Sequence, residues 1–174
     1  MDDFKRFQDV VEKYARAYAD FESIQKPGKD RIDFVPEKGD QKTGVIGEAY
    51  IFKYLTEKGC KNLEFGDPSQ KSWDIKYTEK GEEITIQVKT VSEFSEKKII
   101  SHILPGFKIL YLVKLNKNLF PEKVLKVTTK GDWPDIRHKA FPKDKFSYKN
   151  CFFQTFDETE DFMKVLQLKS NKIL

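Results

Sequence analysis

Three observations predict that the chain folds into a single domain that contains both helices and strands (α/β), with a mixed sheet of the α+β type. Apolar residues recur at helical spacing over residues 3–24 and again over 42–58. Two segments of alternating polarity, 72–78 and 82–91, flank a short turn. The segment 107–115 is almost wholly apolar, as in a buried strand. A chain of 174 residues with fifteen Phe, seven Tyr and two Trp can fill one core, so we expect one domain over 1–174.

Two helices are expected before the strands. The stretch after residue 24 contains two Pro and two Gly and predicts a long connection. In the segment 42–58, Val45, Ala49, Phe52 and Leu55 form one stripe, and Gly59 follows as a stop signal. Glu48 falls on the same stripe, where a carboxylate is costly unless it meets a cation or a metal. A glutamate at the edge of the stripe that reaches water would give the same pattern.

The remaining elements follow in order. A short strand is expected over 62–67, and Lys80-Gly81 suits a two-residue hairpin turn between the next two strands. After the apolar strand, Val124 and Val127 indicate another strand over 123–128. The region 130–150 is rich in loop-forming residues, and Asp157 is placed to cap a final helix over 158–168.

Charge is unevenly distributed along the chain. The formal net charge is +4, but residues 1–96 carry −4 and residues 97–149 carry +9. A basic segment interleaved with aromatic residues suits a phosphate backbone, although a solvated lysine-rich surface has the same composition.

Several classes of protein are excluded by composition. With only Cys60 and Cys151, the chain has neither a disulfide scaffold nor a four-cysteine zinc site. No stretch is as long and apolar as a membrane span, and the N-terminus has no apolar signal core, so we expect a cytoplasmic protein.

A candidate site follows from the hairpin. If Lys80-Gly81 is the turn, Tyr77 faces Ile84 and Asp74 faces Gln87, provided that no bulge shifts the register. Lys89 shares the face of Gln87, because side chains alternate along a strand. Carboxylate and amide oxygens are ligands that Mg²⁺ accepts, and the Val88 carbonyl lies between the two side chains. A lysine beside such a cation can activate a water or stabilise an oxyanion, which describes phosphodiester hydrolysis.

At these residues the chain resembles the PD-(D/E)xK nuclease superfamily, whose members have the restriction-endonuclease-like fold. The matching residues are Gly47-Glu48 on a helix, Asp74 in Ser-Trp-Asp-Ile, and Gln87-Val88-Lys89, a Q-x-K variant of the motif. The resemblance covers about residues 40–115 and implies a catalytic core of helix, three-strand meander, helix and strand. It leaves an N-terminal helix and connection over 1–39 and a basic extension with a final helix over 116–174.

The resemblance also implies roles for the residues. Asp74, Gln87, the Val88 carbonyl and Glu48 are implied as ligands of Mg²⁺ or Mn²⁺, and Lys89 as the catalytic lysine. The implied substrate is double-stranded DNA, cut by a type II restriction-like homodimer.

Two departures from the family pattern keep alternatives open. Trp73 stands before Asp74 where the motif has Pro, and Gln87 replaces a charged ligand. The alternatives are a catalytically inactive member of the fold that binds DNA or protein, and a structure-specific nuclease for junctions or repair intermediates.

Candidate DNA contacts lie in the basic segment. In the resembled fold, the segment after the catalytic strand approaches the DNA. We therefore expect contacts from Lys97, Lys98, Ser101, His102 and Arg137. A solvated polar connection is the alternative for these residues, and a buried loop anchor is the expected role of Trp133.

Overall fold

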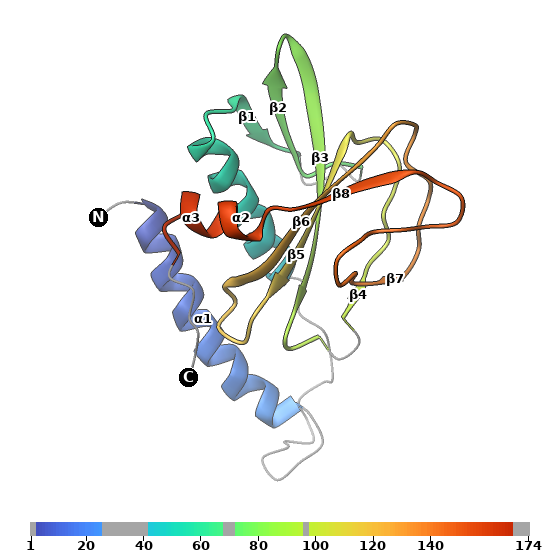
Figure 1. Ribbon diagram of the computed structural model, residues 1–174. Coiled ribbons are helices and arrows are strands. Elements are labelled where there is room, and N and C mark those ends of the chain that lie inside the picture. The colour runs from blue at the N-terminus through green and yellow to red at the C-terminus, as the bar shows by residue number, and fades with distance from the viewer. Residues whose placement is uncertain (1–2, 26–41, 68–71, 96–97, 169–174) are drawn as a thin grey trace.

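The computed structural model describes residues 3–25, 42–67, 72–95 and 98–168 of the chain (Figure 1). The described helices are α1 (Asp3–Gln25), α2 (Lys42–Glu57) and α3 (Thr159–Val165). The main sheet has six strands: β1 (Lys61–Phe65), β2 (Ile75–Glu79), β3 (Glu82–Ser92), β5 (Ile109–Leu115), β6 (Pro121–Thr129) and β8 (Phe153–Asp157). A second, two-stranded sheet pairs β4 (Ile99–Ile100) with β7 (Lys139–Ala140). The architecture confirms the predicted α+β class.

The six-stranded sheet is mixed, with the order β1-β2-β3-β5-β6-β8. Only β3 and β5 run parallel, and each remaining neighbouring pair is antiparallel. β3 extends well beyond its pairing with β2, because β2 has five residues and β3 has eleven. The second half of β3 therefore has β5 on one side and no β2 on the other.

The hairpin between β2 and β3 has the predicted register. Tyr77 pairs with Ile84 and Glu79 with Glu82, as a turn of two residues requires. Lys80 and Gly81 have φ values of 51° and 82°. Two positive φ values in succession give the turn the twist that matches the flanking strands.

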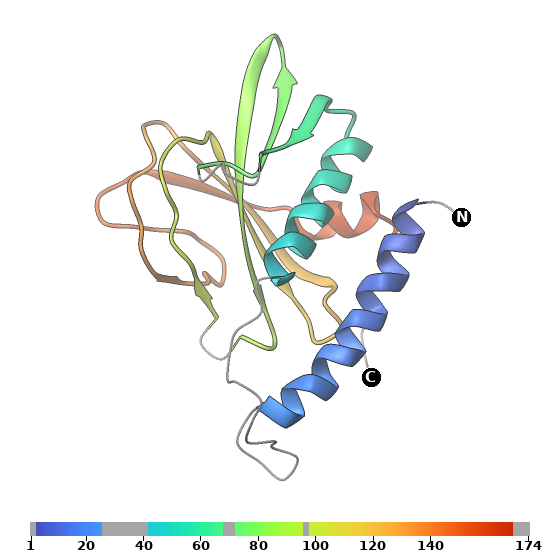
Figure 2. The same cartoon turned by 180° about the vertical axis from the view of Figure 1, so that it is seen from behind.

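The two faces of the sheet pack against different layers (Figures 1 and 2). On one face, side chains of α1, α2 and α3 join Ile86, Val88 and Tyr111 in one apolar cluster. On the other face, Leu110 and Leu112 pack against the segments between β4 and β8, including Trp133. We call the second layer, residues 98–108 and 130–152, the lobe. Trp133 is 4% exposed, which confirms its predicted role as a loop anchor.

The segment between β3 and β5 differs from the expected core. The resemblance implied a helix there, but described residues 93–95 and 98–108 form none. Instead they contain β4 and an isolated bridge between Ile103 and Ile136. Three β-branched residues, Ile99, Ile100 and Ile103, favour extended backbone, and Pro105 follows them as a helix breaker.

Two predictions near the end of the described chain also need correction. β8 lies partly where a helix cap was expected, and it pairs with β6 from Leu125–Asp157 to Thr129–Phe153. The cap residue of α3 is Glu158 rather than Asp157, although Asp157 Oδ1 still accepts the Thr159 N–H at 3.1 Å.

Glu158 attaches α3 to the sheet. The Tyr54 hydroxyl donates to Glu158 Oε2 at 3.2 Å or to Asp161 Oδ2 at 2.6 Å, and the Tyr111 hydroxyl donates to Glu158 Oε2 at 3.1 Å. Both tyrosines are 2% exposed, so their hydroxyls need these acceptors. None of the described helices combines the length and the apolar character needed to cross a bilayer.

Candidate functional site

The candidate site lies where β2 separates from β3. The last regular pair of the hairpin is Ile75 with Ile86. One residue earlier, the Asp74 N–H donates to the Ile86 carbonyl at 2.8 Å, so the register slips by one residue. The predicted pair of Asp74 with Gln87 is therefore wrong in detail. With this slip, both the backbone N–H and the carboxylate of Asp74 contact β3.

The Asp74 carboxylate caps the free edge of β3. Its Oδ2 accepts the Val88 N–H at 2.7 Å. In a strand, the N–H and C=O of one residue point to the same edge, so the Val88 carbonyl faces the side on which Asp74 lies. Asp74 and the Val88 carbonyl are thus placed together, as the sequence predicted.

Gln87 is almost fully buried, at 1% exposure. Its Nε2 donates to the Ser72 carbonyl at 3.3 Å. Its Oε1 is buried and has no hydrogen-bond partner among the described residues. An unpaired buried amide oxygen is costly, and a bound cation is one group that would satisfy it.

A close approach between α2 and β3 places Glu48. Gly47 packs directly against the Thr90 side chain, and an added Cβ would come within 3.0 Å of both Thr90 Cβ and Cγ2 and closer still to Oγ1. Only glycine fits this contact without a shift. Glu48, the next residue, is half-buried beside the point where α2 meets β3.

The buried face of α2 coincides only in part with the predicted stripe, since Leu55 is buried and Phe52 packs against the core but Val45 does not. Val45 is 64% exposed, whereas Ile46 and Tyr50 are buried. Glu48 therefore flanks the core-facing side of the helix instead of lying among core residues.

Burial shifts the pKa of all three charged residues of the candidate site, and their neighbours' charges add to or oppose its effect. Burial raises the pKa of the Asp74 carboxyl, against the opposing effects of the Val88 amide and of Lys89. Burial and the proximity of Asp74 raise the pKa of Glu48, and Lys89 opposes this shift. Burial lowers the pKa of Lys89, although both carboxylates favour its charged form. A half-buried cluster in which desolvation dominates is a common feature of functional sites.

The ligand set has few charges. Within the described part of the chain, no three His, Cys, Asp or Glu side chains lie close enough together to hold a metal ion. A cation at this site would have two carboxylates, from Glu48 and Asp74, and otherwise neutral oxygens. Such a set matches the hard-ligand preference of Mg²⁺ but binds it less strongly than three carboxylates would.

The residues predicted to contact DNA differ in whether they already bind another protein group. Lys98 Nζ donates to the Ser92 carbonyl at 2.6 Å and lies 3.6 Å from Glu93. His102 Nε2 lies 2.7 Å from Asp135 Oδ1. Ser101 and Arg137 are exposed, and Lys97 lies outside the described residues.

Two neighbours of the site were not predicted. Ser72 holds the Gln87 side chain, and Thr90 receives Gly47. Both are common polar residues, and only the three-dimensional contact distinguishes them. Comparison of the chain with known protein families and with curated proteins gave no match.

Proposed function

We propose that this protein is a Mg²⁺-dependent DNA endonuclease, of the type II restriction-like kind. One observation carries the proposal: Glu48, Asp74 and Lys89 form a partly buried cluster of charges, Asp74 lies at the free edge of β3, and Gln87 of the same strand has a buried amide oxygen without a partner among the described residues. Two acids, an amide oxygen and a lysine are the groups that hydrolysis of a phosphodiester requires.

The donor set fits a small hard cation. Asp74, Glu48, Gln87 Oε1 and the Val88 carbonyl would hold it. When bound, Mg²⁺ would supply positive charge to a phosphate oxygen and acidify a water molecule.

The side chains of Asp74 and Lys89 would have separate roles in the reaction. The hydrogen bond from the Val88 N–H fixes one oxygen of Asp74 and so orients the other. Because burial lowers the pKa of Lys89, its neutral form is easier to reach at moderate pH and can take a proton from the attacking water. In its charged form, Lys89 would instead stabilise the negative charge that develops on the phosphorus oxygens.

The surroundings of the site suit a polyanion. α2 lies on one side of β3 and the lobe on the other when the molecule is viewed from behind (Figure 2). Six cations of the lobe form no ion pair within the described part of the chain: Lys130, Arg137, Lys139, Lys143, Lys145 and Lys149. These charges are available to phosphates.

Plasmid cleavage tests the proposal. Purified protein is incubated with supercoiled plasmid and Mg²⁺, and the product ends are sequenced. We expect cleavage that falls at least 100-fold in Asp74→Asn and Lys89→Ala, since each removes a group required in the transition state. Glu57→Gln on α2 and Lys117→Ala are the matched controls. Cleavage by Asp74→Asn at the wild-type rate would refute the assignment.

A second candidate is a DNA-binding protein that does not cleave. The observation in its favour is the low charge of the ligand set, with Gln87 where a third carboxylate would strengthen metal binding. Calorimetric titration with Mg²⁺ and Mn²⁺ separates the two candidates: saturable binding that Asp74→Asn abolishes favours the enzyme. DNA binding without any metal binding favours the second candidate.

We propose further that the enzyme acts as a homodimer, since cutting both strands of a duplex requires two sites. Analytical ultracentrifugation with and without a DNA duplex measures this. A monomer on DNA that still makes double-strand breaks contradicts it.

A further inference from the structure

β8 is an open edge of the main sheet. The six-stranded sheet ends in β1 on one side and in β8 on the other. The Glu158 N–H donates to the Val124 carbonyl at 3.0 Å, so the backbone of Glu158 points toward β6. Because backbone groups alternate between the two edges of a strand, those of Phe153, Thr155 and Asp157 point away from β6. Within the described part of the chain, these outward N–H and C=O groups have no hydrogen-bond partner.

The opposite edge of the sheet has features that prevent strand pairing, and β8 lacks them. β1 has a register shift between Lys61 and Glu64, and Asn62 has a φ of 52°. An irregular backbone and a lysine are two common means of protecting an edge strand. β8 pairs with β6 without a register shift over its five residues and contains neither Lys nor Pro. Its edge is therefore a regular template for another strand.

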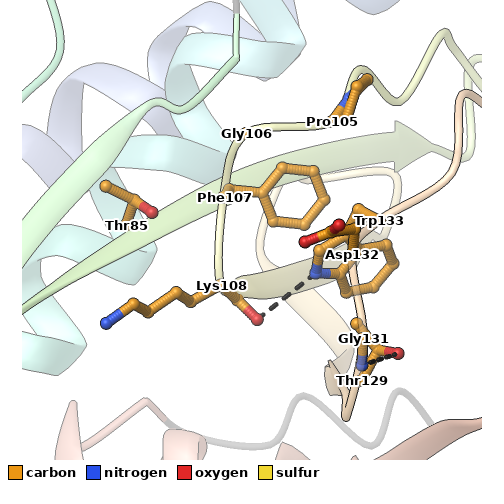
Figure 3. Close-up of a pocket in the computed structure, with 9 residues that line it drawn as sticks. All are labelled: Thr85, Pro105, Gly106, Phe107, Lys108, Thr129, Gly131, Asp132 and Trp133. Atoms are coloured by element: carbon orange, nitrogen blue, oxygen red, sulfur yellow. Dashed lines mark hydrogen bonds between the residues drawn. The ribbon is translucent and has the colours of Figure 1, made fainter.

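The lobe holds β8 in place. The Phe153 ring is buried, and its centroid lies 5.0 Å from that of Phe146 and 5.1 Å from that of Trp133. Trp133 is fixed in turn, since its Nε1 donates to the Lys108 carbonyl at 3.3 Å (Figure 3). The Phe146 N–H donates to Thr155 Oγ1 at 3.0 Å. A strand that is already ordered loses little conformational entropy when a partner pairs with it.

Two phenylalanines beside this edge are exposed. Phe152 is 61% exposed and Phe156 is 47% exposed. Both alternate with the buried Phe153 and so lie on the other face of the strand. A hollow of about 460 Å³, lined by residues 144–145 and 152–156, runs beside them. Exposed aromatic side chains next to an unpaired strand edge are features of a surface that pairs with another chain.

We propose that β8 pairs with the β8 strand of a second copy of this chain, antiparallel and around a two-fold axis at Thr155. The inference rests on the proposed function only for the expectation that two copies associate. In this register, Gln154 lies opposite the second copy's Phe156. The diagonal neighbours of Phe156 are then the second copy's Phe152 and Phe156, at about 7–8 Å, which is within reach of aromatic side chains. The pairing therefore gathers four exposed phenylalanines into one cluster.

Register and charge both favour a second copy in the antiparallel orientation. Thr155 is the middle one of the three outward-facing residues, so an axis at this position pairs all three with the second copy. The segment before β8 contains Lys145 and Lys149, whereas Asp157 ends β8 and Glu160 follows it. Antiparallel pairing places the basic start of one strand beside the acidic end of the other, and parallel pairing would place like charges together.

Sedimentation equilibrium measures the association, without DNA or metal. We expect the wild type to be in a reversible equilibrium of monomer and dimer. Phe156→Lys places like charges on the diagonal of the strand pair and should weaken the dimer at least tenfold. Val10→Lys is the control, because Val10 is also exposed but lies on α1, and it should change the dissociation constant less than twofold. A wild type that stays monomeric, or a dimer that Phe156→Lys leaves intact, would overturn the inference.

Disulfide cross-linking tests the register, in a chain with Cys60→Ser and Cys151→Ser. One preparation carries Gln154→Cys and another carries Phe156→Cys. The proposed register places these two positions opposite each other, with about 4.5 Å between Cα atoms. Equivalent positions of the two copies lie on a diagonal of about 7–8 Å, too far for a disulfide. Oxidation of the mixture should give at least tenfold more covalent dimer than oxidation of either preparation alone, and equal yields would contradict the pairing.

The outcome is separable from that of the proposed function. Asp74→Asn should dimerise like the wild type, because β5 and β6 separate β8 from the strand that Asp74 caps. A dimer with this cross-link in a protein that fails to cleave DNA supports the interface and rejects the nuclease. Cleavage that depends on Asp74, in a protein that stays monomeric and gives no cross-link, supports the nuclease and rejects the interface.

Discussion

Gln87 lies on β3 with a buried amide oxygen that has no protein partner among the described residues, and the same holds for the buried hydroxyl of Thr90 three residues later. The amide nitrogen donates to the Ser72 carbonyl, two residues before Asp74 in the chain, so the Gln87 side chain is held next to the segment that leads into Asp74. In the proposed site, the amide oxygen of Gln87 is a neutral metal ligand, so its substitution tests ligand charge at constant size.

We predict that Gln87→Glu tightens Mg²⁺ binding at least tenfold, since a third carboxylate adds charge to the ligand set. Without metal, the same change should lower the free energy of unfolding by about 1–3 kcal/mol, because another charge is buried. Gln154→Glu, at an exposed position, is the control. Urea unfolding with and without Mg²⁺ measures both effects. Equal stability of the variant and the wild type in both conditions would contradict the metal site.

The raised pKa of Asp74 predicts a pH-dependent effect of its removal. The folded protein holds the Asp74 proton more tightly than the unfolded chain, whose ordinary pKa is 3.8. Folding therefore takes up a proton between 3.8 and the raised value, and stability falls as the pH rises through that window.

Asp74→Asn should consequently unfold at higher urea concentration than the wild type at neutral pH without metal. The free energy of unfolding should rise by about 1 kcal/mol, as when other buried charges of functional sites are removed. This difference in stability should vanish as the pH falls below 3.8, where the Asp74 carboxyl is protonated in both the folded and the unfolded chain. Excess Mg²⁺ should reverse the order, since only the wild type is stabilised by binding. A gain that is constant between pH 4 and 8 would show that burial of the Asp74 charge is not its cause.

For the candidate site, the sequence predicted that Asp74 lies against β3 but not the contacts that hold it there. Asp74 and the Val88 carbonyl lie together, as local strand geometry required, yet the slip at Asp74 depends on how β2 ends. Ser72 and Thr90 were not predicted, because their contacts with Gln87 and Gly47 join residues 15 and 43 positions apart. No periodicity within one element reports such contacts.

The close approach of α2 to β3 depends on a glycine at position 47, which has no side chain. Gly47 leaves room for Thr90, and Glu48 follows it on the helix. We predict that Gly47→Ala pushes α2 away, lowers the free energy of unfolding by about 1–3 kcal/mol and weakens metal binding. Thr90→Ala in the same chain removes the Oγ1 and Cγ2 atoms and should recover part of both losses.

A double-mutant cycle with thermal unfolding and Mg²⁺ titration measures this coupling. Gly44→Ala on the same helix is the control, since its added Cβ meets only Glu48 Oε1 at 3.9 Å. Additive effects of Gly47→Ala and Thr90→Ala would show that the two residues do not limit the approach.

The sequence predicted those elements that nearby residues stabilise, and it missed the short strands that form only by pairing with distant segments. The β2–β3 hairpin was found because Lys80-Gly81 itself favours the turn. β8 was missed because it has five residues and gains its order from β6, about 30 positions earlier. β4 was missed for the same reason, since its two residues pair with β7.

Within the described residues, most cations of the basic segment fall into two groups. On the sheet, Lys114, Lys123 and Lys126 each lie near a carboxylate, at 3.0, 2.6 and 3.8 Å. On the lobe, Arg137 and five lysines have no such partner within the described residues. The basic segment seen in the sequence therefore overstates the charge available to a partner.

We predict that replacing Arg137, Lys139 and Lys149 by Gln lowers the dependence of DNA binding on salt. The slope of log K against log salt should fall by about 2–3, since each phosphate contact contributes about 0.9. The control is a triple variant, Lys13→Gln, Lys61→Gln and Lys80→Gln, which removes three positive charges outside the lobe. Titrations of Asp74→Asn in these two backgrounds, followed by fluorescence anisotropy, measure the slopes without cleavage. Equal slopes would place the phosphates on another surface.

The attachment of α3 has a consequence for synthesis of the protein on the ribosome. Tyr54 contacts Glu158 and Asp161 across more than 100 residues, and Phe162 completes the cluster around Tyr50. Until residues 158–166 have left the exit tunnel, the outer side of α2 carries aromatic groups without their cover. Nascent chains that stall before this point would expose an apolar surface that chaperones bind. The groups proposed for catalysis thus emerge well before the helix that completes the packing around α2.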